Sequence, residues 1–141
     1  MPPRFSPSGR PWRILVIDDD DAVRTCTRAL LARAGFDSED AACADSGLAA
    51  AHASRPDLIL LDLRMKDVDG IDALQRLRAD PSLRSIAIAA YSGFVPLFGE
   101  SRLRTLGFDE LIYKPLNFSE LLANVLAILD RPRPPALSAA A

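Results

Sequence analysis

The chain has 141 residues, about the length of one domain, and its 49% hydrophobic and 26% charged residues are typical of a globular protein. Its formal net charge of −2 gives no overall positive field, so we expect no direct binding to nucleic acid. No apolar run reaches the roughly 18 residues of a membrane span, and the N-terminus lacks the apolar core of a signal peptide. We therefore expect a cytoplasmic protein that makes no membrane contact.

Proline-rich segments mark both ends of the chain. Seven of the eleven prolines lie within residues 1–11 and 131–141. Proline fixes one backbone angle and lacks an N–H donor, so regular hydrogen-bonded structure is unfavourable there. We expect a flexible N-terminal arm at 1–11, a folded domain at 12–130 and a Pro/Ala-rich tail at 131–141.

Within the folded part, short apolar runs alternate with stretches of helical period. The runs predict strands at 13–17, 36–41, 56–62, 86–91 and 111–113. The helical spacing predicts helices at 21–34, from a cap at Ser46 to a point before Pro56, between Asp69 and Asp80, at 101–106 and from Asn117 to Leu129. Repeated βα units with right-handed crossovers produce a doubly wound parallel α/β sheet.

The third apolar run, Leu58–Leu61, ends abruptly in Asp62. An unbroken run of this length is typical of a strand that is buried on both faces of a parallel sheet. In open α/β sheets, ligands bind at the carboxyl ends of the strands. An isolated aspartate at a strand end is more often a turn cap, so the interpretation of Asp62 depends on the residues at the neighbouring strand ends.

The first strand also ends in carboxylates, those of Asp18, Asp19, Asp20 and Asp21. Asp20 and Asp21 suit the N-terminus of the following helix, where negative charge is favourable. Asp18 and Asp19 lie at the strand tip and converge with Asp62 if the first and third strands are neighbours. Three adjacent carboxylates repel one another unless a hard cation lies between them, and oxygen ligands of this kind suit Mg²⁺.

Two further strand ends carry polar groups. Ser92 follows the fourth strand, and Lys114-Pro115 follows the fifth. A hydroxyl donor and an ammonium that face a metal-bound carboxylate stabilise the charge of a phosphoryl group. Taken singly, the serine fits a turn and the lysine fits a surface position, but the polar groups at four strand ends together indicate a phosphate-handling site.

These motifs resemble the response-regulator receiver domain of bacterial two-component signalling. The matching segments are Ile14–Asp19, Pro56–Met65, Asp69-Gly70, Tyr91-Ser92-Gly93 and Tyr113-Lys114-Pro115. The resemblance, which is to chemotaxis-regulator-like stand-alone receivers, implies a flavodoxin-like fold. Its five-stranded parallel sheet has the order 2-1-3-4-5 and is flanked by five helices.

By this resemblance, Asp62 is the phosphoacceptor and takes a phosphoryl group from a histidine kinase or phosphorelay protein. The reaction is Mg²⁺-dependent and forms an acyl phosphate. The domain is then a signalling protein rather than an enzyme, apart from slow self-dephosphorylation. With no effector domain after the last helix, we expect output through phosphorylation-dependent contacts with a downstream protein, although the chain equally fits a receiver cut from a longer regulator.

The resemblance also implies roles for the surrounding residues. The Mg²⁺ ligands are Asp19, Asp18 largely through water, Asp62 and the backbone carbonyl of Arg64. The phosphoryl-stabilising residues are Ser92 and Lys114, and a cis peptide bond at Pro115 directs the lysine inward.

The sequence departs from the family pattern at several positions. Leu111 stands where the family commonly has the aromatic switch residue, and a leucine has neither a hydroxyl nor a ring edge. Lys66-Asp67 replaces a frequent Pro and Gly, which changes the charge beside the acceptor. The apolar residues within 93–100 fit either a partner surface or packing under the next helix.

Two other functions remain open. Asp18-x-Asp20 after a strand resembles the opening motif of haloacid-dehalogenase-type phosphatases, although Ala22 occupies the place of their threonine and the chain has no room for a cap domain. A phosphorylation-independent interaction module on the same fold is the other alternative, and the leucine at position 111 favours it.

Overall fold

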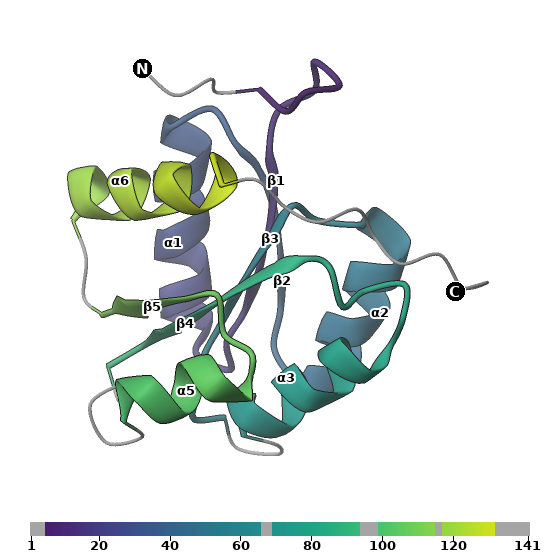
Figure 1. Cartoon of the computed structure of the whole chain (residues 1–141). Helices are drawn as coiled ribbons and strands as arrows, with labels where there is room; N and C mark the ends of the chain where they lie inside the picture. Colours follow the sequence, from purple (N-terminus) through teal and green to yellow (C-terminus); the bar gives the residue numbers. More distant parts are fainter. Residues whose placement is uncertain (1–4, 66–68, 94–98, 115–116, 132–141) are drawn as a thin grey trace.

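Five parallel strands form one sheet in the order β2-β1-β3-β4-β5, which confirms the predicted doubly wound fold. The computed structural model describes residues 5–65, 69–93, 99–114 and 117–131. The strands are β1 Arg13–Ile17, β2 Asp37–Ala41, β3 Leu58–Leu61, β4 Ala87–Ser92 and β5 Glu110–Tyr113. The helices are α1 Asp21–Arg33, α2 Ala44–Ser54, α3 Gly70–Ala79, α5 Glu100–Leu106 and α6 Phe118–Leu129. Figure 1 shows α1 and α6 on one side of the sheet and α2, α3 and α5 on the other.

The central strand β3 explains the unbroken apolar run. All four of its side chains are fully buried, and their alternation sends them to opposite layers. Ile59 and Leu61 pack with the layer of α2, α3 and α5, whereas Leu58 and Leu60 pack with the layer of α1 and α6. The edge strand β2 is only partly buried and is accordingly rich in charged residues. Burial on two faces therefore fixes β3 in the middle of the sheet.

Three helices begin close to the carboxyl edge of the sheet with a side-chain cap. Asp20 caps α1 by accepting hydrogen bonds from two first-turn amides. Asp69 caps α3 by accepting from the amide of Asp72 at 2.9 Å, and Asn117 caps α6 by accepting from the amide of Glu120 at 2.8 Å. These caps accept hydrogen bonds from first-turn N–H groups that have no partner within the helix, and they fix the residue at which each loop ends and the helix begins.

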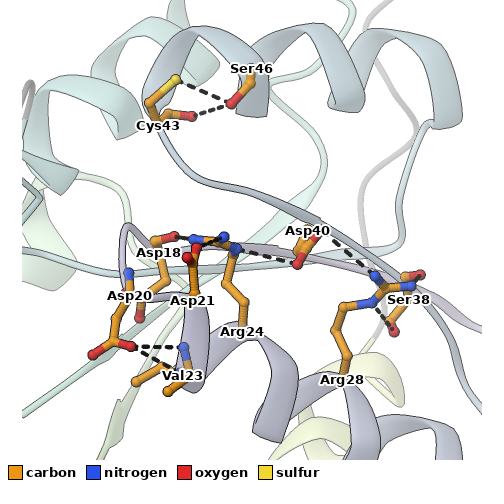
Figure 2. Close-up of polar contacts among 11 residues, drawn as sticks. Asp18, Asp20, Asp21, Val23, Arg24, Arg28, Ser38, Asp40, Cys43 and Ser46 are labelled. Carbon is orange, nitrogen blue, oxygen red and sulfur yellow. Dashed lines mark hydrogen bonds and ion pairs between the residues drawn. The ribbon is translucent and has the colours of Figure 1, made fainter.

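The predicted start of α2 is wrong. The helix begins at Ala44 with Cys43 as its N-cap, so Ser46 lies in the first turn and is not the cap. The Ser46 hydroxyl turns back to Cys43, where its oxygen lies 3.2 Å from the backbone carbonyl and 3.1 Å from Sγ (Figure 2). A serine inside a helix commonly bonds to a preceding carbonyl in this way, and its capping preference is then not expressed.

The described part of the N-terminal arm contacts the domain. Phe5 and Pro11 form an isolated antiparallel bridge, and the amide of Ser6 donates to the carbonyl of Arg10 at 2.8 Å. The Arg10 guanidinium donates to both carboxylate oxygens of Asp57, at 3.0 and 3.2 Å. A closed turn and an ion pair thus connect residues 5–11 with one another and with the folded domain. The rest of the predicted arm, 1–4, and residues 132–141 of the predicted tail lie outside the described residues.

Gly70 allows α3 to start directly against the end of β3. Its amide donates to the carbonyl of Leu63 at 2.8 Å. A Cβ atom at this position would lie 2.1 Å from the backbone oxygen of Asp62 and 2.7 Å from the Cα of Leu63. Both are backbone atoms, so a side chain here would displace the end of the strand that carries Asp62.

We predict that Gly70→Ala lowers the free energy of unfolding by about 1–3 kcal/mol, because the new methyl group overlaps the backbone. Urea denaturation followed by circular dichroism measures the loss. The control is Gly93→Ala, since no atom lies within 4 Å of a Cβ at that position. Equal losses in the two variants would contradict the close approach of α3 to β3.

Candidate functional site

The ends of β1 and β3 bring three carboxylates together. The amide of Asp62 donates to the carbonyl of Ile17 at 2.9 Å, so the residues that follow the two strands lie side by side. Asp18, Asp19 and Asp62 each offer a carboxylate oxygen, and these three oxygens lie within 4.8 Å of one another. Asp18 and Asp62 are buried, with 1% and 7% of their surface exposed. The structure thus places the three predicted ligands at one point.

Lys114 supplies positive charge to this cluster. Its Nζ forms an ion pair with the carboxylate of Asp18 and lies 3.8 Å from Oδ1 of Asp62. The backbone amide of Lys114 donates to the carbonyl of Ser92 at 3.2 Å, which continues the pairing of β5 with β4. The pairing of the strands therefore aims the lysine across the sheet edge toward the first strand.

Ser92 and Arg64 also contact the Asp62 carboxylate. Ser92 is completely buried, and its hydroxyl hydrogen-bonds to Asp62. The backbone amide of Arg64 lies 3.5 Å from Oδ1 of the same carboxylate. Asp62 is thus surrounded by a hydroxyl, an amide, an ammonium and two acids.

The pKa of Asp62 is raised above that of an ordinary aspartate. Burial is the main cause, and the negative charge of Asp18 adds to it, while Lys114, the Ser92 hydroxyl and the Arg64 amide oppose the shift. The ionised carboxylate is consequently destabilised in this structure. A cation among these acids would relieve that repulsion, and an all-oxygen donor set fits Mg²⁺.

A cleft of about 560 Å³ opens between this edge of the sheet and α1. Its lining includes Asp19, Asp62 and Lys114, together with Thr27 of α1 and Tyr91 of β4. The cleft therefore reaches Asp19, which is partly exposed, while Asp18 and Asp62 lie buried at its wall.

Arg24 is a positioning residue that the sequence reasoning missed. Its NH1 donates to the backbone carbonyl of Asp18 at 2.7 Å, and its Nε donates to Asp40 of β2 at 3.2 Å (Figure 2). The guanidinium also pairs with Asp21 at the start of α1. The position of Arg24, one helical turn after the acidic run, indicated a contact with that run. Its second partner, Asp40 on β2, is distant in sequence and could not be predicted.

Tyr91 and Leu111 lie on opposite faces of the sheet. The tyrosine packs in the layer of α1 and α6, whereas Leu111 packs in the layer of α3 and α5 and is 7% exposed. Tyr91 therefore does not replace the missing aromatic at position 111. The predictions for Lys66-Asp67, for Pro115 and for the apolar residues 94–98 lie outside the described residues.

The comparisons with known proteins agree with this geometry. Residues 14–126 match the model of the response regulator receiver domain. The chain belongs to this family. It is 36% identical over 119 residues to the DNA-binding dual master transcriptional regulator RpaA of Synechocystis, and this match covers 84% of the chain and 49% of RpaA. The chain thus spans about half the length of the curated relatives that it matches.

Solved receiver domains share the fold. A CheY-like receiver domain protein from Methanospirillum hungatei superposes with a TM-score of 0.76 at 31% identity, covering 84% of this chain and 94% of that one. The receiver domain of the sensor histidine kinase PA1611 from Pseudomonas aeruginosa superposes at 0.77 and 25% identity, covering 85% and 98%. Its structure has a magnesium ion coordinated in the active-site cleft.

The family membership makes this chain a phosphoacceptor signalling domain of the two-component type. The phosphatase alternative loses its support, because Asp20, its second motif residue, caps α1 and accepts from the amides of Ala22 and Val23. None of the described helices is long and apolar enough to cross a membrane.

The raised pKa of Asp62 predicts a pH-dependent gain in stability for Asp62→Asn. A buried acid with a raised pKa favours folding below its unfolded pKa, and this contribution is lost as the pH rises through the folded pKa. In EDTA, Asp62→Asn should therefore unfold at higher urea concentration than the wild type at pH 7, with the gap closing as the pH approaches 4. The exposed Asp37→Asn serves as control, and a gap that widens toward low pH would contradict the burial of the charge.

Proposed function

We propose that Asp62 accepts a phosphoryl group from a histidine kinase or phosphorelay protein and that the domain then signals to a downstream protein. The observation that carries this proposal is the surroundings of the Asp62 carboxylate. Its oxygens meet the hydroxyl of Ser92 and lie 3.8 Å from the ammonium of Lys114, in a cleft that is open to solvent. Lys114 also pairs with Asp18, which lies nearer to the ammonium and is more deeply buried than Asp62.

These residues divide the work of phosphoryl transfer. A carboxylate oxygen of Asp62 forms a bond to phosphorus while the P–N bond of the donor phosphohistidine breaks, and its electron pair returns to the imidazole nitrogen. The Ser92 hydroxyl and the Lys114 ammonium stabilise the charge on the transferred oxygens. The acyl phosphate carries more negative charge than the carboxylate it replaces, and it forms beside Asp18 in buried surroundings, so the Lys114 ammonium is needed to offset the added charge.

Asp19, Asp62 and the backbone carbonyl of Arg64 would hold Mg²⁺ directly, with Asp18 acting largely through water. Such an ion would supply positive charge to these acids and to the oxygens of the incoming phosphoryl group. The convergence of three carboxylate oxygens within 4.8 Å supports this assignment, as does the magnesium ion in the cleft of the PA1611 receiver domain.

The domain acts in the cytoplasm. It passes its signal on through contacts with another protein and does not itself bind nucleic acid. RpaA and MtrA are named as DNA-binding regulators, but the chain matches about half of each. The proposal includes slow self-dephosphorylation and assigns the domain no other catalysis. A phosphorylation-independent interaction module would share this fold but would take up no phosphoryl group.

Incubation with Mg²⁺ and acetyl phosphate, followed by intact-mass spectrometry, tests the acceptor. We expect a mass increase of one phosphoryl group in the wild type and none in Asp62→Asn. Asp45→Asn, a change at an exposed position in α2, should keep the adduct. No adduct in the wild type with acetyl phosphate or phosphoramidate would support the interaction module, and an adduct that persists in Asp62→Asn would place the acceptor elsewhere.

We also predict that Asp19→Asn raises the Mg²⁺ concentration for half-maximal phosphorylation by about tenfold or more, because it removes one anionic oxygen ligand. The initial rate of adduct formation across a Mg²⁺ titration measures the change. Asp20→Asn is the matched control, since asparagine retains the capping oxygen at the start of α1. An unchanged Mg²⁺ requirement in Asp19→Asn would remove this residue from the metal site.

A further inference from the structure

The ammonium of Lys114 lies over the aromatic ring of Tyr91. Nζ is 5.1 Å from the ring centroid, within the range of a cation–π interaction. The tyrosine is 5% exposed, so water does not screen this face of the ring to the extent that it would at the surface. Lys114 thus has two kinds of partner, the carboxylates of Asp18 and Asp62 and one uncharged ring.

Thr27 of α1 contacts the hydroxyl of Tyr91. Its hydroxyl oxygen lies 3.3 Å from that of Tyr91, and both side chains are buried. The other tyrosine, Tyr113, precedes the lysine in sequence, but its hydroxyl donates to Glu100 of α5 and it is 39% exposed. The two tyrosines therefore offer a matched pair, of which one has its ring under the ammonium.

We infer that Tyr91 is a positioning residue for Lys114, a role that rests on the proposed phosphoryl transfer at Asp62. In this structure Nζ of Lys114 pairs with Asp18 and lies 3.8 Å from Oδ1 of Asp62. A phosphoryl group on Asp62 would need the same ammonium as its partner. The lysine must therefore change its anionic partner without leaving the cleft. A ring beneath Nζ attracts the cation in both positions and limits the freedom of a long, flexible side chain.

The neutrality of the ring suits this role. A carboxylate in its place would compete with Asp18 and Asp62 for cations and would repel a phosphoryl group. The ring quadrupole attracts the ammonium without adding a formal charge to an already acidic cleft. Tyr91 therefore steadies Lys114 while leaving the charge balance of the three acids unchanged.

NMR of the lysine ε-methylene groups tests the contact in the protein without metal or phosphate. The chain has two lysines, so Lys66→Arg assigns the Lys114 signal. We expect an upfield ring-current shift for Lys114 in the wild type, in Tyr91→Phe and in the control Tyr113→Leu. The shift should be lost in Tyr91→Leu and in Tyr91→Met, whose unbranched side chain fills the space. A Lys114 signal that is unchanged in both would overturn the inference.

Phosphorylation rates with acetyl phosphate and Mg²⁺ test the consequence. Tyr91→Leu and Tyr91→Met should slow adduct formation about 3- to 10-fold, whereas Tyr91→Phe and Thr27→Val should stay within about 2-fold of the wild type. Wild-type rates in the variants without the ring would refute positioning, as would a failure of phenylalanine to restore the rate. If the wild type takes up no phosphate, the proposed function fails instead, and the NMR shift still reports on the contact.

Discussion

Burial of the Asp62 carboxylate beside Asp18 at the end of β3 is the constraint on which the rest of this site depends. Asp62 lies beside Asp18 with little exposure to water, and this surrounding raises the pKa of Asp62. Lys114 offsets part of the repulsion between the two acids by pairing with Asp18. The fold thus holds the acids closer together than their charges favour, and a divalent cation between them would relieve this repulsion.

The backbone that holds the acids is fixed from several directions. Burial of β3 on both faces places Asp62 at the middle of the sheet edge, and Gly70 lets α3 begin against its carbonyl. Arg24 ties the carbonyl of Asp18 to α1 and to the edge strand β2. Because these contacts come from separate elements, the geometry of the cluster depends on the whole sheet and not on one loop.

Much of this arrangement was predictable from sequence, since it depends on short-range patterns. The apolar run that ends in Asp62 indicated a central strand, and the polar groups at the other strand ends indicated the site. What the sequence did not reveal depends on partners that are distant along the chain. The contact of Arg24 with Asp40, the ion pair of Arg10 with Asp57 and the position of the Tyr91 ring under Lys114 all required the strand register.

The two faces of the sheet carry different parts of the site's support. Leu111 packs in the layer of α3 and α5, where it offers no polar group to Ser92, whereas the ring of Tyr91 supports Lys114 from the layer of α1. The ring of Tyr91 is buried, lies under Lys114 and lines the cleft.

Chemical location of the acyl phosphate tests the central claim most directly. Borohydride reduces an aspartyl phosphate to homoserine, which peptide sequencing by tandem mass spectrometry assigns to one position after treatment with Mg²⁺ and acetyl phosphate. The account predicts homoserine at position 62 and at no other aspartate. Homoserine at position 18 or 19, or a phosphorylated protein without homoserine, would contradict it.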